Sequence, residues 1–166
     1  AIETILVNAC KAQKFGDAEM TWVIQNPNFE TGDFTGWTVT TQWDTKVGHQ
    51  SSSISADYAD GLYLFNTWND FVDPKNNLPI KQTITGLPNG TYRLTAAVTS
   101  TPGNKVFVFA NNTSGEGYTA EAENKLGDTS VEFEVTNGTA EIGVVGANDG
   151  VFNIEGGSWY KADNFR

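Results

Sequence analysis

The sequence predicts an all-β domain, a β-sandwich of jelly-roll type, with a short helix at its N-terminus. The 17 glycines, together with many threonines and asparagines, favour short strands joined by tight turns. Several segments alternate between apolar and polar residues; Val131, Phe133 and Val135, for example, are separated by glutamates. Turn signals recur at the spacing typical of a sandwich, and there is no alternation of strands and helices.

The first element, over residues 1–15, is expected to be an amphipathic helix. Gly16 is well placed to end it. Two interpretations stay open: a helix packed on the edge of the domain, or the last helix of an upstream domain. The predicted division is therefore a helix or domain remnant at 1–16 and a β-sandwich at 21–166. The predicted helix presents one apolar face, made of Ile2, Ile5, Leu6, Ala9 and Cys10.

About nine strands follow the helix. Long polar or glycine-containing stretches at 44–60, 67–78, 111–127 and 146–157 are expected to separate some of them. The predicted strands are Thr21–Gln25, Trp37–Trp43, Leu62–Asn66, Ile80–Thr85, Thr91–Thr101, Lys105–Ala110, Val131–Val135, Ala140–Val145 and a closing strand over 159–164.

Three of these segments carry more specific signals. Alternate residues of 91–101 share an apolar face, from Tyr92 to Val98. The segment 105–110 is apolar on both faces, which predicts a central strand covered by the opposite sheet and, on its other side, by loops or the N-terminal helix. Asn137-Gly138 is the preferred dipeptide of a two-residue hairpin.

Two segments at opposite ends of the predicted sandwich are expected to be neighbours. Residues 26–37 form a turn region with two apolar anchors, Phe29 and Trp37. Residues 159–166 have the period-two pattern of a closing strand. A β-sandwich commonly closes with its first and last strands side by side, so we expect the two segments to be neighbours.

Charge and composition exclude several functions. The formal net charge of −10 repels phosphate backbones and anionic lipid, so neither nucleic acid nor a membrane surface is an expected partner. No run of about 18 apolar residues predicts insertion into a membrane. One histidine, His49, and one cysteine, Cys10, cannot supply a zinc site or an internal disulfide. No nucleophile-elbow sequence surrounds a serine, and no acid pair falls in a catalytic motif, so an enzyme is not expected.

Three segments together resemble galactose-binding-domain-like jelly rolls of the carbohydrate-binding-module type. They are Asn28-Phe29-Glu30 with Gly36-Trp37, the turn and strand over 87–94, and Trp159–Phe165. The resemblance spans roughly residues 22–166. It implies a non-catalytic, monomeric accessory domain of a larger bacterial protein, secreted or at the cell surface, with a glycan and neighbouring domains of the same polypeptide as partners.

The same resemblance implies a structural calcium ion held by Glu30 and Asp163. Carboxylate oxygens are the hard ligands that calcium prefers, and Asn28 and Asp33 could add further oxygens. The alternative is that the two acids accept hydrogen bonds from backbone N–H groups where strands meet.

Aromatic residues in the polar segments are the candidate sugar platforms, because the C–H face of a pyranose stacks on an aromatic ring. Trp68 is the first candidate, since it lies in the predicted loop 67–78. Trp43 and Phe71 are further platforms, with Asn69 and Asp70 as hydrogen-bonding partners. Trp37 and Trp159 are assigned to the core. The function so predicted is binding of a neutral glycan; the alternative is a structural or protein-interaction spacer that binds no sugar.

Overall fold

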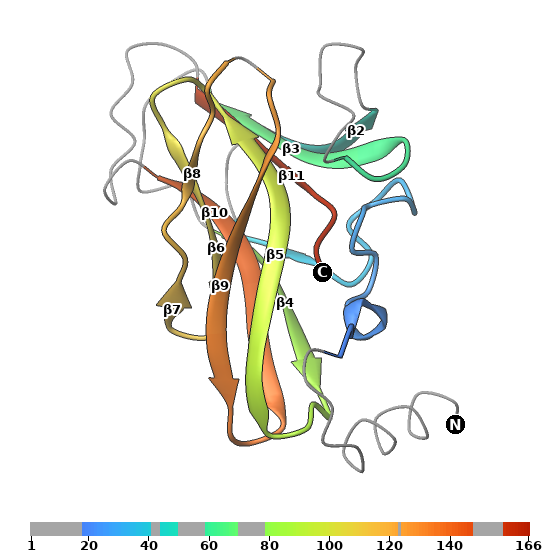
Figure 1. Cartoon of the computed structure of the whole chain (residues 1–166). Helices are drawn as coiled ribbons and strands as arrows, with labels where there is room; N and C mark the ends of the chain where they lie inside the picture. Colours follow the sequence, from blue (N-terminus) through green and yellow to red (C-terminus); the bar gives the residue numbers. More distant parts are fainter. Residues whose placement is uncertain (1–17, 41–43, 50–58, 70–78, 123, 148–157) are drawn as a thin grey trace.

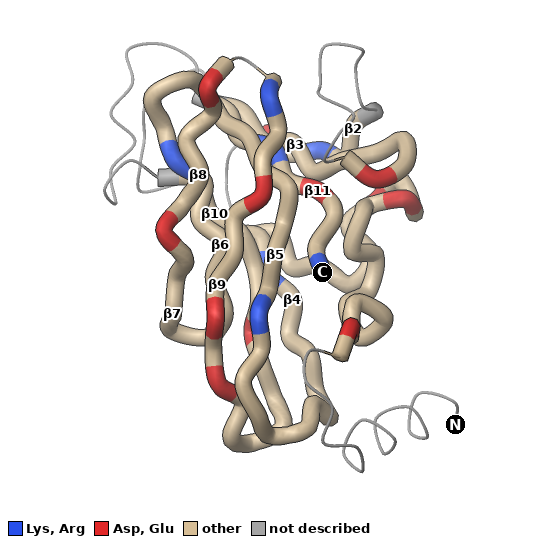
Figure 2. Tube along the Cα trace, in the orientation of Figure 1, with Lys and Arg blue, Asp and Glu red and all other residues tan. Residues whose placement is uncertain are grey.

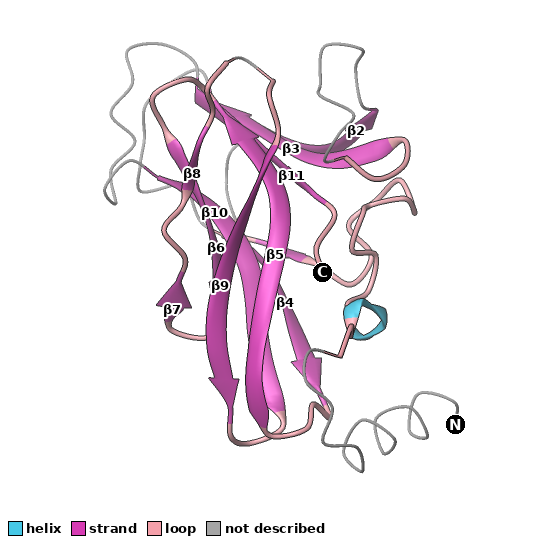
Figure 3. Ribbon diagram, in the orientation of Figure 1, coloured by secondary structure: helices cyan, strands magenta, loops and turns pink. Residues whose placement is uncertain are grey.

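A computed structural model describes residues 18–40, 44–49, 59–69, 79–122, 124–147 and 158–166. Within them the chain forms two antiparallel sheets that pack face to face (Figures 1 and 3). The predicted N-terminal helix over 1–15 lies outside the described residues, as does most of the predicted loop 146–157. The all-β sandwich predicted from the sequence is confirmed.

The first sheet has the strand order β1-β4-β10-β6-β7, with β8 also paired to β6, and the second has the order β2-β3-β11-β5-β9. One turn of 3₁₀ helix, Thr21–Val23, precedes them. The strands are β1 Thr38–Val39, β2 Asp44–His49, β3 Tyr63–Asn69, β4 Ile80–Thr85, β5 Gly90–Ser100, β6 Lys105–Ala110, β7 Thr113–Ser114, β8 Tyr118–Thr119, β9 Gly127–Val135, β10 Thr139–Ala147 and β11 Ser158–Asp163.

The core lies between the two sheets and follows the alternation of the strands. In β9, Val131, Phe133 and Val135 are buried while the residues between them are exposed. The expected apolar face of β5 is confirmed, with Leu94, Ala96 and Val98 buried against the first sheet. Each fully buried aliphatic side chain of this kind contributes about 1.5–3 kcal/mol of transfer free energy, which explains why the pattern specifies the faces.

Strand β6 is a central strand, as its apolar sequence predicts. It pairs with β10 on one side and with β7 and β8 on the other. Val106 and Val108 face the core, while Phe107 lies on the opposite face. There, Gly117 of the β7–β8 connection lies so near the Phe107 ring that a Cβ would be 2.7 Å from it. A loop therefore covers the outer face of β6 at this point.

The two terminal segments of the sandwich are neighbours, as expected. The backbone N–H of Phe165 donates to the carbonyl of Pro27 at 2.9 Å. The rings of Trp37 and Phe165 lie 4.6 Å apart, and the Phe29 ring contacts both. The Trp37 indole also donates to the carbonyl of Asn26 at 3.0 Å. This buried aromatic cluster fastens the 26–37 turn region to the end of β11.

The predicted strand over 21–25 is wrong. Its residues form the 3₁₀ turn, with local hydrogen bonds from Val23 to Met20 and from Ile24 to Thr21. Of this stretch only Ile24 is buried, so the β-branched and aromatic residues there do not reflect a sheet. The described residues contain eleven strands where about nine were expected, because β2, β7 and β8 lie in stretches read as polar connections.

The predicted hairpin at Asn137-Gly138 is also wrong. Strand β9 belongs to the second sheet and β10 to the first, so the turn crosses between sheets and does not join paired strands. The connection from β4 to β5, which resembles a middle hairpin, crosses in the same way. The two crossings lie side by side, since the Leu87 N–H donates to the Gly138 carbonyl at 3.0 Å. A turn dipeptide indicates a reversal of the chain but not which sheet receives it.

Candidate functional site

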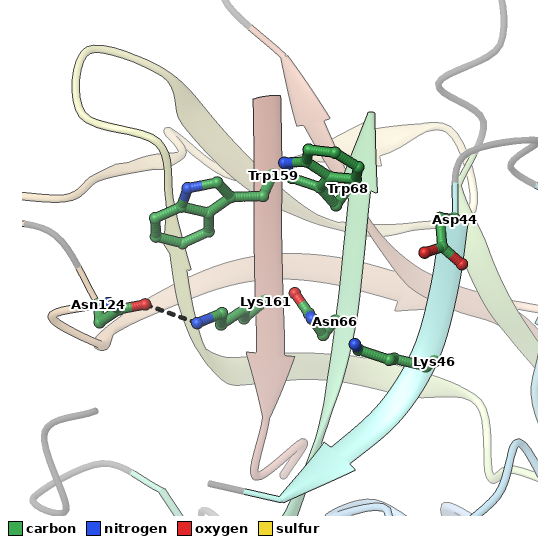
Figure 4. A pocket seen from close by; sticks show the side chains of 7 residues that line it. All are labelled: Asp44, Lys46, Asn66, Trp68, Asn124, Trp159 and Lys161. Atoms are coloured by element: carbon green, nitrogen blue, oxygen red, sulfur yellow. Dashed lines mark hydrogen bonds between the residues drawn. The ribbon is translucent and has the colours of Figure 1, made fainter. Parts of the chain in front are cut away.

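A pocket of about 310 Å³ lies on the outer face of the second sheet, over β2, β3 and β11 (Figure 4). Strand register arranges most of its side chains in two rows across the sheet. Asp44, Trp68 and Trp159 are cross-strand partners in one row. Lys46, Asn66 and Lys161 are partners in the next row. We call this pocket the tryptophan groove; it is lined by Asp44, Lys46, Asn66, Trp68, Asn124, Trp159 and Lys161.

Trp68 is exposed, as predicted, but for a different reason. It does not lie in a loop: β3 continues through Thr67 and Trp68 to Asn69. Thr67 points inward, fully buried, and its hydroxyl is 3.0 Å from that of Thr45 on β2. Trp68 must then point outward, and 40% of its surface is exposed. A large aromatic on the solvent face of a strand, where nothing requires its burial, is a candidate for ligand contact.

Trp159 was assigned to the core, and this assignment is wrong. It lies in β11 directly opposite Trp68, is only partly buried, and lines the tryptophan groove beside it. Tyr160 takes the inward position, fully buried against the Phe65 ring at 5.5 Å. Because alternate residues of a strand face opposite sides, only one of these two adjacent aromatics can enter the core.

Lys161 lies at one side of the groove, where its ammonium group contacts Asn124 and Trp159. The Nζ atom donates to the Asn124 side-chain oxygen at 2.5 Å and lies 4.8 Å from the centre of the Trp159 ring. Asn124 itself has a left-handed backbone, with φ of 59°, in the connection before β9. Leu126, two residues later, is fully buried with Leu64 and Ala97, which anchors this connection on the sheet.

Other predicted sugar-binding residues lie where the structure does not test them. Trp43, Asp70 and Phe71 fall outside the described residues. Asn69 ends β3, and its side chain is likewise outside the description. Of the residues that line the groove, the sequence predicted only Trp68 as a ligand contact. It missed the other six: Asp44, Lys46, Asn66, Asn124, Trp159 and Lys161. Strand alternation in Trp159-Tyr160-Lys161 was the available signal, but the register that brings three strands together was not readable from it.

The predicted metal residues lie together at another place, below the end of β11. Glu30 Oε1 accepts hydrogen bonds from the backbone N–H groups of Leu62 and Tyr63 at 2.6 and 2.7 Å. Asp163 Oδ2 accepts from the Asp60 N–H at 2.8 Å. These are the contacts of the alternative interpretation, in which the acids bind backbone amides where strands meet.

Asp163 is buried, and its environment disfavours the charged form. Burial is the main cause that raises the pKa of the Asp163 carboxyl to about 7, and the negative charges of Asp60 and Glu30 contribute in the same direction. The hydrogen bond from the Asp60 backbone opposes this shift without cancelling it. The carboxyl groups of Glu30, Asp60 and Asp163 thus lie near one another, and the free-energy cost of ionising in this environment falls on Asp163.

The donor set at this end consists of oxygen atoms, which suits a hard cation such as calcium. The side-chain amide of Asn28 donates to Asp60 Oδ2 at 3.1 Å, which keeps this asparagine beside the acids. Asp33 is occupied in its own turn, where Oδ1 accepts from Thr31 and Thr35. Within the described part of the chain, no group of three or more acidic, histidine or cysteine side chains is arranged to hold a metal ion. The chemistry of the acids fits calcium, while their present hydrogen bonds occupy them.

A second depression, of about 620 Å³, lies between the 18–24 segment and the β4–β5 crossing. Its floor is the apolar end of the core, including Leu94 and Phe133. Its lining includes the stacked rings of Tyr92 and Phe133, of which Phe133 is buried, and the Arg93–Glu132 pair, whose charges bind each other. It thus offers no ring as exposed as Trp68. The tryptophan groove is therefore the better candidate for a ligand site.

Solved structures similar to this chain include modules that bind sugars. TmCBM61, determined in complex with beta-1,4-galactotriose, matches with a TM-score of 0.69 at 23% identity, over 86% of this chain and 94% of that chain. Family 16 Carbohydrate Binding Module-2 matches with a TM-score of 0.53 at 22% identity, over 87% and 97%. The enzymatically active domain of bacteriophage CBA120 tailspike protein 4 matches with a TM-score of 0.55 at 16% identity, over 86% of this chain and 20% of that chain.

Comparison by sequence adds no family. No family model matches the chain, and no curated protein matches it. Identities below 25% show the fold alone, and the fold is the jelly roll of carbohydrate-binding modules. No helix in the described ranges is long and apolar enough to cross a membrane.

Proposed function

We propose that this chain, whose fold is the jelly roll of carbohydrate-binding modules, binds a glycan in the tryptophan groove. The observation that carries the proposal is the pairing of Trp68 and Trp159 as outward-facing cross-strand neighbours. Their rings stand beside each other on adjacent strands (Figure 4). Two neighbouring indoles offer stacking surfaces for neutral pyranose units, and Asn66 and Asp44 supply hydrogen-bonding groups for their hydroxyls.

The role that follows is binding without catalysis. A glycosidase needs two carboxyl groups placed across the scissile bond. The groove contains one acid, Asp44, among its described lining residues. We infer a non-catalytic binding module that belongs to a larger secreted or surface protein, as the resemblance implies. The fold supports the binding-module part of this inference, since TmCBM61 shares it over 94% of its own length.

The alternative function is a spacer or docking domain that binds no sugar. Burial of Trp68, Trp43 and Phe71 would have favoured it, and of these only Trp68 lies within the described residues. Trp68 is instead 40% exposed, and its partner Trp159 shares the same open face. The observation therefore supports the glycan-binding proposal over the spacer.

The experiment is a screen of the wild-type protein against immobilised oligosaccharides, with beta-1,4-galactotriose included, followed by calorimetry on any glycan that binds. Trp68→Ala and Trp159→Ala are each expected to weaken binding at least about tenfold, the equivalent of about 1.4 kcal/mol per stacking contact. Trp22→Ala is the matched control, because Trp22 is 38% exposed and does not line the groove. A folded wild type that binds no glycan, or binding indifferent to both groove substitutions, would favour the spacer.

We also propose a structural calcium ion at the Glu30–Asp163 end. A divalent cation would offset the repulsion among Glu30, Asp60 and Asp163 that accompanies burial of the last carboxyl. Glu30 and Asp163 would hold it, and its contribution would be to stabilise the junction of β11 with the 26–37 segment. Added calcium is expected to raise the melting temperature of the wild type and not that of Asp163→Asn. No calcium effect on the wild type would leave the acids as acceptors of backbone hydrogen bonds.

A further inference from the structure

The second row of the tryptophan groove, formed by Lys46, Asn66 and Lys161, carries two positive charges. Lys46 and Lys161 flank Asn66 in one line across β2, β3 and β11. Neighbouring strands lie about 4.8 Å apart, so the two lysine Cα atoms are separated by about 10 Å. The Lys46 ammonium points toward Asn66, while the Lys161 ammonium is turned to the other side of β11, toward Asn124 (Figure 4). Two lysines and one acid, Asp44, give the described lining residues a formal charge of +1, in a chain whose net charge is −10.

The acid and the cations of the groove occupy different rows. Asp44 stands in the row of the tryptophans, two residues along β2 from Lys46. Two residues of a strand extend about 6.6 Å. Among the described residues, Lys46 is exposed and takes part in none of the recorded ion pairs. Its charge is thus directed to the open face and not neutralised by the neighbouring carboxylate.

Lys161 is positioned more firmly than Lys46. The Asn124 side-chain oxygen and the Trp159 ring hold its ammonium over the sheet at 2.5 and 4.8 Å. A lysine fixed beside an aromatic platform lies where a substituent of the stacked sugar would arrive. Lys161 therefore places a positive charge beside the Trp159 ring, and Lys46 places a second one beside Asn66.

We propose that the tryptophan groove selects a glycan in which a sugar bearing a negative charge lies beside the neutral units stacked on Trp68 and Trp159. The proposal rests on the glycan-binding function above and names the ligand class of that same site. Lys161 donates a charge-assisted hydrogen bond to the anionic group, a carboxylate or a sulfate ester, beside the Trp159 ring, and the charge of Lys46 beside Asn66 adds to the attraction. The net charge of −10 disfavours a densely charged polymer, so the ligand carries isolated anionic units.

The test uses matched ligands that differ only in charge. A uronic-acid-containing trisaccharide is compared with the same trisaccharide after reduction of its carboxyl group to a hydroxymethyl group, and galactotriose with its sulfated form. Calorimetry of the wild type at about 0.05 M salt is expected to favour the anionic member of a pair about 3- to 10-fold, the effect of two partly exposed charge contacts. Preference in either pair supports the inference, and the larger preference identifies the anionic group.

Variants assign the preference to residues. Lys46→Gln and Lys161→Gln are each expected to lower the anionic-to-neutral affinity ratio, and the double variant to bring it to about one. Lys46→Arg keeps the charge and retains the preference. Lys105→Gln, on β6 of the other sheet, is the control for loss of a positive charge elsewhere. Raising the salt to about 0.5 M should reduce the ratio in the wild type.

Two failures are distinguishable. Equal affinity for the charged and neutral members of both pairs, with binding still lost in Trp68→Ala, overturns the anionic selectivity and leaves glycan binding intact. A ratio that survives in the double lysine variant also overturns it. Absence of binding to every oligosaccharide overturns the glycan-binding function itself.

Discussion

The buried carboxyl of Asp163 makes the stability of this protein depend on pH in a direction opposite to that of most carboxyls. Its pKa in the folded state is about 7, against 3.8 for an ordinary aspartate. Between these values the folded protein binds a proton that the unfolded chain has released. The free energy of unfolding therefore falls as the pH rises through this window. One pH unit is worth about 1.36 kcal/mol, so the full loss is about 4 kcal/mol by pH 8.

The assay is urea denaturation in EDTA, at intervals from pH 5 to pH 8. Asp163→Asn replaces the carboxyl by an amide whose oxygen can still accept the hydrogen bond from the Asp60 backbone. This variant should lose the pH dependence and be more stable than the wild type at pH 8. Asp33→Asn is the control, because Asp33 is exposed and hydrogen bonds from Thr31 and Thr35 lower its pKa, away from the window.

Histidine side chains ordinarily titrate near pH 6.5, within the measured range. The wild type and Asp163→Asn are therefore also measured with the sole histidine replaced, as His49→Gln. A flat wild-type profile between pH 5 and pH 8 in that background would refute the reasoning. An unchanged slope in Asp163→Asn would refute it equally.

Two further substitutions test the junction and the aromatic cluster. Gly61→Ala should destabilise the fold by about 1–3 kcal/mol in thermal melts, because Gly61 has φ of +88° and a Cβ would lie 2.3 Å from the Glu30 carboxyl carbon. Gly90→Ala is the control, since nothing lies within 4 Å of its new Cβ. Trp37→Phe should lower the free energy of unfolding in urea by about 1–3 kcal/mol, since it removes part of a buried ring system and its 3.0 Å hydrogen bond to a backbone carbonyl. Trp22→Phe, at a 38% exposed position, should change the same free energy by less than about 0.5 kcal/mol.

The sequence was most informative where a pattern is local. The alternation in β9 and β5 and the two-sided apolar character of β6 predicted their faces, because period-two burial is read directly from neighbouring residues. The pairing of Phe29 and Trp37 with the closing segment also followed from the sequence, as large aromatics at both ends of a sandwich must find the same core.

The candidate site was less predictable, because it depends on register. Trp68 was identified as exposed from the polarity of its surroundings, although it lies in a strand. Trp159 and Lys46 reach Trp68 through pairings across three strands that are distant in the chain, and nothing local specifies which residues become partners. Figure 2 shows basic positions scattered over several strands among the acidic ones, and only the strand pairing brings Lys46 and Lys161 into one row.

Strand β11 enters the second sheet between β3 and β5, with antiparallel neighbours on both sides. Until it docks, β3 and β5 each present an unpaired edge, and part of the tryptophan groove is missing, since Trp159 and Lys161 arrive with this strand. A molecule in which β11 is undocked would therefore lack the proposed glycan site and be prone to edge-to-edge association. Under the proposed function, a glycan column would retain molecules with β11 docked and release those without it.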